Sequence, residues 1–508
     1  MNHSVKCVGL ETISSLRILR QSVVSVEGIE LGLEQKKEGY RLAILAPPGS
    51  PFFEGFEGEL LNQGSQSLLV GPANPRNASV LRFRLPWLRP RLLGLRTSAG
   101  LGDRLGLATP GHVRAVRATG GTVAPIFPQQ SIREMSRTGR TPQQVMDDAT
   151  WGVLAEGWQE GFGADADHLK TTVDIDACMR SGFTFFTIDP GEYVDNRAET
   201  ASLSELRAAL NGLPWEKLED DPRALSARYL SQSVDAEGYR IRFDEHRLLR
   251  AVVKYGRAVA HVATMYWHLT GLAGGRNCEL EISIDETETP TSHAEHVYIA
   301  SELKRLGVRW VSLAPRYVGR FEKGVDYIGD LAAFESDFSV HAAIARQLGP
   351  YKLSLHSGSD KFSIYPIAMR LTGGLVHLKT AGTSYLEALR TIAAHDSELF
   401  RSIYVFARER YETDRASYHV SACLDRAPLP EAVSNAELPV LLNHFDAREI
   451  LHVTFGSVLT SRLPDGGWRF YDLFMDVLHS HPDTYAANLE AHFLRHLKPF
   501  VSVAKAQF

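Results

Sequence analysis

Cysteine is scarce in this chain of 508 residues, and its four cysteines form no recognisable motif. Cys7, Cys178, Cys278 and Cys423 lie far apart, and none belongs to a CxxC pair. This spacing excludes a sequence-readable zinc finger or redox motif and is typical of proteins from a reducing compartment. Basic charge is not in excess either, because the net charge is −5. Binding to nucleic acid therefore has no electrostatic support.

Long apolar segments are also lacking. No run is long and apolar enough to span a bilayer, and the first residues, MNHSVKCVGLETISS, contain no apolar core of a secretory signal. We therefore expect a cytoplasmic protein with no membrane partner. The sequence leaves the oligomeric state open, and a homo-oligomer is among the alternatives.

Common catalytic motifs are absent as well. The chain has no P-loop, no HExxH and no G-x-S-x-G. The stretch SAGLGDRLG (98–106) loosely resembles a dinucleotide fingerprint, but its spacing is GxGxxxG, and no acidic residue follows the next predicted strand. We therefore expect no nicotinamide cofactor. A cradle for phosphate or carboxylate at a helix N-terminus stays open for this stretch.

What the chain does have is the composition of a folded globular protein, with 44% apolar and 23% charged residues. Strand-like runs at 40–45, 67–70 and 80–83, separated by turn clusters such as APPGSP, predict a β-rich N-terminal unit over 1–90. Helical patterns dominate 396–508 and predict a helical C-terminal extension.

The segment 91–395 alternates short apolar runs with helical patterns, which indicates βαβ units and a parallel sheet. Eight such runs favour a TIM-type (β/α)8 barrel, in the α/β class, over an open doubly wound sheet. An insertion at about 194–275 is rich in helix formers and is predicted to be helical. The predicted strands are 92–96, 122–127, 161–165, 183–188, 280–284, 309–313, 351–355 and 374–379.

Polar residues gather at the ends of these strands, where a barrel of this kind builds its active site. Side chains alternate between the two faces of a strand, so the apolar positions assign the others to the interior. The third strand ends at Asp165, and Asp167, His168 and Lys170 come directly after it. The predicted inward positions of the fifth, seventh and eighth strands are Glu279, Glu281, Ser283, Asp285, Lys352, Ser354, His356, His377 and Lys379.

Three histidines are predicted at this one rim, His168, His356 and His377. A single histidine is more often a hydrogen-bonded structural residue than a ligand. Three near several carboxylates favour a bound metal, because buried polar groups need partners. Imidazole with carboxylate suits zinc, nickel, manganese or iron, so we predict a divalent cation held by these histidines.

His293 and His296, in TSHAEH, imitate a ligand pair because they are three residues apart. The preceding Thr-Ser is a helix N-cap signal, so we favour a structural position at a helix terminus over a metal site. The histidines after residue 395 share no spacing and are interpreted as structural.

At these same stretches the sequence resembles the tagaturonate/fructuronate epimerases of bacterial hexuronate catabolism. The resemblance covers most of 91–386 and implies a barrel core, dependence on a divalent metal, and interconversion of D-tagaturonate and D-fructuronate. The N-terminal unit and the helical tail carry less of it. The matching segments are RTSAGLGDRLGLATPGH, FGADADHLKT, FTIDPGEY, EISIDETETPTSHAEH, VSLAPRYVGRFEKGVDYIGD and YKLSLHSGSDKFSIYP.

The substrates that this resemblance implies differ at a carbinol carbon that is β to the ketone. The hydrogen on that carbon is not acidified by the carbonyl, so simple enolisation cannot invert it. Two routes remain: retro-aldol cleavage followed by re-addition, and transient oxidation by a nicotinamide. The metal-like cluster and the poor dinucleotide fingerprint favour the retro-aldol route.

That route needs an acid/base pair, for which we predict Asp167 and Glu281, with Glu286 as a rival to Glu281. Arginine and lysine side chains are the natural partners of a substrate carboxylate. The predicted substrate-binding residues are Ser98, Gln129, Arg316, Lys361 and Lys379.

Two alternatives stay open. One is another metal-dependent barrel epimerase, isomerase or aldolase that acts on a neutral ketose, such as tagatose or fructose, or on a ketose phosphate. The other is a catalytically silent sugar-binding relative. The density of titratable groups at the strand ends argues against a silent relative, since a binding module has little need of them.

Overall fold

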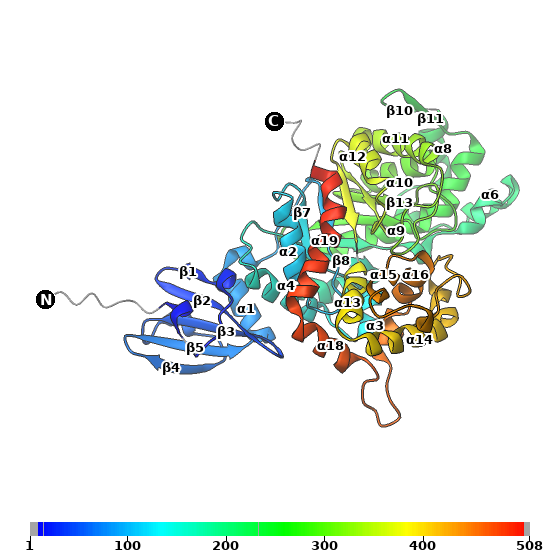
Figure 1. Ribbon diagram of the computed structural model, residues 1–508. Coiled ribbons are helices and arrows are strands. Elements are labelled where there is room, and N and C mark those ends of the chain that lie inside the picture. The colour runs from blue at the N-terminus through cyan, green and yellow to red at the C-terminus, as the bar shows by residue number, and fades with distance from the viewer. Residues whose placement is uncertain (1–8, 14, 232, 381, 502–508) are drawn as a thin grey trace.

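The computed structural model describes residues 9–13, 15–231, 233–380 and 382–501 (Figure 1). Cys7 and most of the N-terminal stretch considered for a signal lie outside these residues. Cys178, Cys278 and Cys423 are free thiols. Among the helices of the described residues, none has both the length and the apolar character needed to cross a membrane.

The N-terminal part is a five-stranded antiparallel sheet with the strand order β1-β2-β3-β5-β4, which confirms the predicted β-rich unit. The run at 80–83 is helical instead of extended. It belongs to α1 (Pro75–Arg84), which Asn74 caps through the Asn77 N–H and which Pro75 starts. The strands are β1 (Val24–Val26), β2 (Ile29–Lys36), β3 (Gly39–Ala46), β4 (Glu59–Gln63) and β5 (Gln66–Pro72), with 3-10 turns at Leu10–Thr12, Arg20–Ser22, Pro51–Phe53 and Pro86–Leu88.

Eight parallel strands close into a barrel in the order β12-β13-β14-β15-β6-β7-β8-β9, which confirms the predicted (β/α)8 core. Every strand pair in the barrel is parallel, as expected when a helix follows each strand. The strands are β6 (Ser98–Gly100), β7 (Ala124–Ser131), β8 (Gly163–Leu169), β9 (Phe185–Ile188), β12 (Glu279–Ile284), β13 (Ser312–Pro315), β14 (Lys352–Leu355) and β15 (Val376–Lys379).

The first barrel strand differs from the prediction, because the apolar run at 92–96 lies just before β6. Backbone N–H groups of Leu93 and Gly94 donate to the Glu279 carboxylate instead of to a neighbouring strand. Leu93 packs on Ala124 and Phe185, which lie at the starts of their strands. The run therefore closes the N-terminal end of the barrel with apolar side chains.

Helices surround the barrel, and several begin at strong local signals. In α3, α4, α5 and α10 a Ser or Thr caps the helix and the residue three positions on bonds back to the cap. α12 ends at Gly373, whose φ is 60°. The helices of this layer are α2 (Thr109–Ala118), α3 (Ile132–Thr138), α4 (Pro142–Ala155), α5 (Thr172–Arg180), α9 (Glu245–Ala273), α10 (His293–Arg305), α11 (Leu331–Leu348), α12 (Tyr365–Thr372) and α13 (Thr383–His395).

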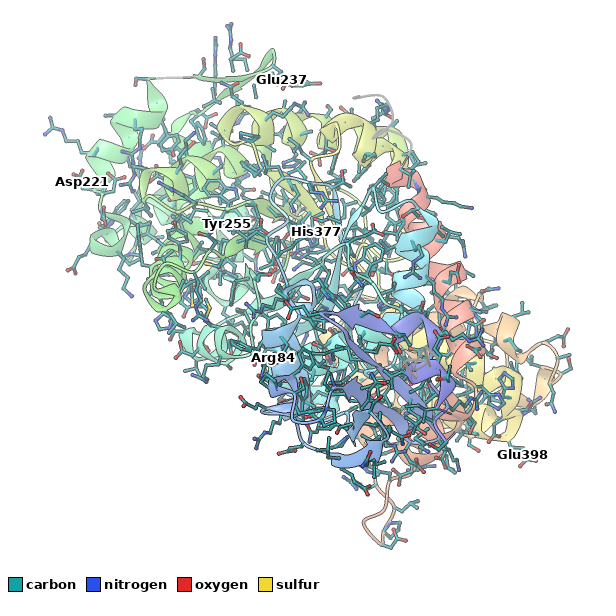
Figure 2. All side chains as sticks on the ribbon, turned by 90° about the vertical axis from the view of Figure 1, so that its left-hand side faces the viewer. Arg84, Asp221, Glu237, Tyr255, His377 and Glu398 are labelled. Carbon is teal, nitrogen blue, oxygen red and sulfur yellow. The ribbon has the colours of Figure 1, made fainter. Side chains whose placement is uncertain are left out.

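The insertion between β9 and β12 is mostly helical, as predicted, and α9 returns the chain to the barrel. It also contains a two-stranded hairpin, β10 (Ser233–Ala236) with β11 (Tyr239–Arg242), where only helix was predicted. Glu237 and Gly238 both have positive φ at its turn, and Figure 2 shows Glu237 at the edge of the molecule. The other elements are Gly191–Tyr193, Asn196–Glu199, α6 (Leu203–Leu210), α7 (Trp215–Leu218) and α8 (Pro222–Leu230).

The C-terminal extension is helical, as predicted. Its last helix, α19, lies against α2, α12 and α13 (Figure 1). It therefore packs on helices that follow the first barrel strand in the sequence, β6, and the last two, β14 and β15. Its helices are α14 (Ser397–Asp414), α15 (Leu438–Leu441), α16 (Phe445–Val453), α17 (Phe455–Thr460), α18 (Tyr471–Ser480) and α19 (Pro482–Val501), with 3-10 turns at Arg415–Ser417 and Pro430–Ala432.

Candidate functional site

The end of β8 carries an irregularity that turns two consecutive side chains toward the barrel mouth. The pairing of β8 with β9 shifts register between Ala166 and Leu169, and His168 has a φ of 52°. Strict alternation would send Asp167 and His168 to opposite faces. The bulge brings both to the mouth, where Asp167 contacts Lys379 and the His168 ring lies against His356.

A buried ammonium group forms the centre of the site. Lys379 Nζ, on β15, lies 2.5 Å from Asp167 Oδ1, 2.8 Å from Glu281 Oε1 and 3.1 Å from Asp165 Oδ2. It also donates to Thr187 Oγ1 over 2.6 Å. Burial alone would lower the pKa of Lys379, but these carboxylates more than offset it and raise the pKa above its ordinary value. Three acids around one base leave the interior with excess negative charge.

The three carboxylates differ in how readily they hold a proton. Burial alone would raise the pKa of each, but Lys379 and the neighbouring histidines hold the pKa of Asp167 and of Glu281 well below its usual range. Asp165 has no histidine beside it and faces the charges of the other two acids. Burial therefore raises the pKa of Asp165 to about 6, despite Lys379. Of the three acids, Asp165 is therefore the one that holds a proton most readily.

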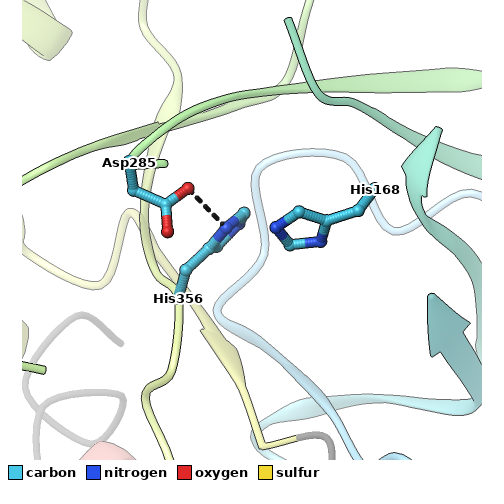
Figure 3. A group of neighbouring side chains, drawn as sticks. All are labelled: His168, Asp285 and His356. Carbon is cyan, nitrogen blue, oxygen red and sulfur yellow. Dashed lines mark ion pairs between the residues drawn. The ribbon is translucent and has the colours of Figure 1, made fainter. Parts of the chain in front are cut away.

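A second group, drawn in Figure 3, lies beside this cluster and consists of His168, Asp285 and His356. One nitrogen or oxygen from each lies within 4.8 Å of the other two. His356 Nδ1 is 2.9 Å from Asp285 Oδ1, and its Nε2 is 2.8 Å from Glu281 Oε1. Burial would lower the pKa of His356, but the two carboxylates raise it to about 10.

Five of the residues predicted from the sequence therefore come together at the barrel mouth. Gln129 joins them indirectly, because its Nε2 donates to Asp165 Oδ2 over 3.1 Å. The five are Asp167, His168, Glu281, His356 and Lys379.

His377 and Ser98 lie one layer deeper in the barrel. His377 precedes Lys379 by two residues on β15, so it points inward from a lower level. Its Nδ1 lies 2.9 Å from Ser98 Oγ, which also accepts from Lys352 Nζ over 2.9 Å. Of the described residues, the three whose ligand atoms converge at the mouth do not include His377. A ligand role for His377 stays a prediction that this group of three does not support. Figure 2 labels His377 near the middle of the molecule.

The placement of Lys361 argues against its predicted contact with a substrate carboxylate. The side chain is fully buried, and its Nζ donates to the backbone carbonyls of Glu322, Val325 and Ser359. An ammonium group has three protons, so none is left for a ligand.

Two further predicted residues lie at the outer edge of the site. Glu286 is exposed and its Oε1 lies 3.3 Å from Arg133 Nη2. Arg316 follows β13 and is half-buried; burial lowers its pKa, and the charge of nearby Asp285 partly offsets this.

Sequence reasoning missed three residues of the site. Asp165 was predicted at the same strand end as Asp167 but given no role, and Asp285 was predicted to point inward but not to bind metal. Lys323 was not singled out at all. Its side chain is half-buried, and it has no hydrogen bond or ion pair with any described residue. Burial lowers the pKa of Lys323, with Arg133 adding to this and Glu134, Glu286 and Asp285 opposing it.

The glycine-rich stretch at 98–106 is not an anion cradle. Its first three residues form β6, and the Asp103 carboxylate accepts from the backbone N–H groups of Leu105, Gly106 and Ala108 over 2.7–2.9 Å. The loop's own carboxylate thus occupies the donors that a phosphate would need.

A closed parallel barrel with acids, a lysine and two histidines at the carboxyl ends of its strands defines a TIM-barrel enzyme. The family model described as UxaE, tagaturonate epimerase, matches residues 20–500. This chain therefore belongs to the tagaturonate epimerase family.

Known members of the family are similar over nearly the whole chain. The tagaturonate/fructuronate epimerase of Thermotoga maritima is 45% identical over 445 residues, which is 87% of this chain and 89% of that protein. Crystal structures of the fructuronate-tagaturonate epimerase UxaE from Cohnella laeviribosi, native and with glycerol, are 38% identical. They superpose with a TM-score of 0.89, and the match covers 96% of this chain and 96–97% of theirs.

Proposed function

We propose that this chain is a metal-dependent epimerase that interconverts D-tagaturonate and D-fructuronate by retro-aldol cleavage and re-addition. The observation that carries the proposal is the group His168, Asp285 and His356 beside the acids that surround Lys379. The names of the Thermotoga and Cohnella relatives support the choice of substrate.

The donor set fits a divalent metal ion. Two imidazole nitrogens and one carboxylate oxygen suit zinc and other first-row metals. Asp167 engages Nδ1 of His168 at 2.7 Å, which leaves Nε2 for a metal. Glu281 engages Nε2 of His356, so Nδ1, which lies 2.9 Å from Asp285, would become a ligand when a metal displaces its proton. Carboxylates on the far nitrogens of both histidines are the usual outer partners of metal ligands. A cation held there would supply Lewis-acid stabilisation of the ketone oxygen as it gains negative charge.

The acids then handle the proton of the reacting hydroxyl. In the proposed reaction a carboxylate, Asp167 or Glu281, removes the proton from the hydroxyl on the carbon β to the ketone. The bond between the α and β carbons breaks, which leaves an aldehyde and an enediolate. After the aldehyde turns, the α carbon attacks its other face, and a proton returns to the new hydroxyl.

Lys379 and Asp165 give this step its electrostatic setting. His168 and Lys379 lower the pKa of Asp167, and Lys379 and His356 lower that of Glu281, so both acids are ionised at neutral pH and either can accept a proton. Asp165, with a pKa raised to about 6, accepts a proton more readily and can hold it beside the same lysine. We therefore assign Asp167 and Glu281 as the acid/base pair and Asp165 as a residue that sets their charge.

Lys323 is the favoured partner for the carboxylate of the substrate. It is a half-buried cation without an ion pair among the described residues, and the charges of Glu286 and Asp285 act on it. A sugar acid would supply the missing negative charge, which a neutral ketose lacks. This distinguishes the proposal from the alternative of a neutral-ketose epimerase. Arg316 stays a second candidate, while Lys361 is withdrawn.

We also propose that the protein acts in the cytoplasm on this free sugar acid, with no nucleic-acid or membrane partner. The support is the absence of basic excess in the sequence and the metabolic substrate of its relatives.

The proposal is tested by product analysis with labelled substrate. NMR of the mixture formed from tagaturonate should show fructuronate, and prior dialysis against a chelator should abolish its formation until a divalent metal is added back. Deuterium on the inverted carbon should give no primary isotope effect, because retro-aldol cleavage breaks a C–C bond there. A ratio of the rates with hydrogen and with deuterium as large as that of a hydride transfer would reject the retro-aldol route. Full activity after metal removal would reject the proposed metal dependence.

A further inference from the structure

A second group of metal-ligating side chains lies outside the barrel, between α10 and α11. His293 is the first residue of α10, and Asp337 and His341 lie one turn apart on α11. His293 Nε2 is 2.9 Å from Asp337 Oδ1, and His341 Nε2 is 3.7 Å from Asp337 Oδ2. One ligand atom of each lies within 4.8 Å of the other two.

Two atoms in this group are buried without a hydrogen bond. Among the described residues, neither Asp337 Oδ2 nor His341 Nε2 makes a hydrogen bond of good geometry, and the His341 side chain is fully buried. The backbone of Val318 interacts more weakly with Asp337, and that of Thr291 with His341. A buried polar atom without a hydrogen bond is unfavourable, because it has lost its water and gained no other partner. The two atoms lie 3.7 Å apart, and a cation between them would satisfy both.

The surroundings of His341 suit a metal ligand. Its Nδ1 lies 2.8 Å from His296 Nδ1, and His296 Nε2 lies 2.8 Å from the Tyr351 hydroxyl. When His341 donates from Nδ1 along this chain, its Nε2 keeps a lone pair toward Asp337.

We propose that His293, Asp337 and His341 bind a zinc ion that joins α10 to α11. Tetrahedral zinc with bonds of about 2.0 Å places neighbouring ligand atoms about 3.3 Å apart. The distance from His293 Nε2 to Asp337 Oδ1 is 2.9 Å, and that from His341 Nε2 to the other oxygen, Oδ2, is 3.7 Å, so small side-chain movements would bring the three residues to this spacing. His293 is 34% exposed, which gives zinc access from solvent. The i,i+3 pair His293 and His296 is not the ligand pair, because His296 is bonded to His341 and Tyr351.

The consequence of this site is structural. Helices α10 and α11 precede and follow β13, so a zinc ion between them would clamp the chain on both sides of that strand. The ring of Tyr317 packs against His341, with centroids 5.6 Å apart, and its hydroxyl donates to the Ser354 carbonyl on β14. Tyr317 therefore links the proposed zinc site to β14, the strand that precedes His356.

Zinc binding by the full chain tests the site. The background variant is Asp285→Asn, which weakens metal binding by the barrel group so that zinc at the helix site can be measured alone. It is compared with two double variants, Asp285→Asn/Asp337→Asn and Asp285→Asn/His293→Gln. Each protein is stripped with a chelator and titrated with zinc, with zinc content and unfolding temperature measured. The background variant should bind one zinc per chain at the helix site and unfold at a higher temperature with zinc. The double variants should bind zinc at least tenfold more weakly there and lose that rise.

The matched control is His268→Gln in the same background. His268 Nε2 lies 2.7 Å from Asp176 Oδ1, a histidine–aspartate pair that belongs to none of the three-ligand groups among the described residues. This variant should behave like the background protein. Equal zinc affinity in the double variants and the background protein would overturn the helix site. Loss of all zinc with Asp285→Asn alone would overturn it too. All these variants already carry Asp285→Asn, so the test of the helix site does not depend on whether the barrel group binds a metal.

Discussion

The imidazole rings of His168 and His356 meet across the mouth of the barrel, with their centroids 4.9 Å apart. Their strands, β8 and β14, stand four places apart in the ring of eight, on opposite sides. Asp285 follows β12, which stands midway between them in the strand order. The three side chains therefore come from three sides of the barrel, and the group exists only when the barrel is closed.

We expect Asp285→Asn to remove the metal from the barrel and to lower turnover by at least about 100-fold, because it deletes one of three charged or imidazole ligands. His356→Ala should do the same. Metal content and turnover of purified protein measure both. His377→Gln is the control and should keep its metal, since His377 bonds to Ser98 in a deeper layer. A metal lost with His377→Gln but kept with Asp285→Asn would show that the ligand set is misassigned.

Lys379→Met should destabilise the protein by about 3–5 kcal/mol, because it leaves buried carboxylates without their cation. Urea unfolding of the metal-free protein measures the loss. The double variant Lys379→Met/Asp165→Asn should recover part of it, since one of the acids is then neutral. If the two losses simply add, the lysine and Asp165 are not coupled.

Lys323→Gln should raise KM for tagaturonate by about 10- to 100-fold, the effect of losing one charge-assisted contact. Any slow activity on neutral tagatose or fructose should be unchanged, because those sugars have no carboxylate. Steady-state kinetics with both kinds of substrate measure the difference. Exposed Lys217→Gln serves as the control, and an equal loss with neutral ketoses would assign Lys323 a role other than carboxylate binding.

Glu449→Gln should flatten the dependence of stability on pH. Glu449 and Glu322 both accept from the Ser421 N–H, and burial together with Glu322 raises the pKa of Glu449 to about 8. The unfolded value is about 4.3, so the folded chain holds an extra proton between these limits. The stabilisation is complete at low pH and is lost as the pH rises toward 8, by up to about 1.4 kcal/mol per unit.

The measurement is the free energy of unfolding at pH 5 to 9 for the wild type and Glu449→Gln, with exposed Glu409→Gln as control. Glutamine mimics the protonated acid, so the variant should gain stability over the wild type as the pH rises. Parallel curves for the two proteins would mean that Glu449 does not hold the proton.

Local sequence patterns predicted most of the secondary structure but located some boundaries wrongly. Seven of the predicted barrel strands overlap observed ones, since apolar alternation and capping residues act over a few neighbours. The first was misplaced because an apolar run can close the barrel end as well as form a strand: Leu93 and Gly94 give their N–H groups to Glu279. The hairpin at Glu237 was missed inside a segment rich in helix formers.

The sequence by itself determined the barrel class, the family resemblance and the strand ends that carry acids and histidines, because these depend on local pattern. Only the tertiary structure decided which of those residues meet. Alternation predicts whether a side chain points inward but not its depth, so His377 was predicted as a metal ligand together with His356. A bulge reverses alternation and places His168 at the mouth. Whether a lysine can bind a ligand depends on partners that are distant in the sequence. Lys361 Nζ donates to three backbone carbonyls, whereas Lys323 has no ion pair among the described residues.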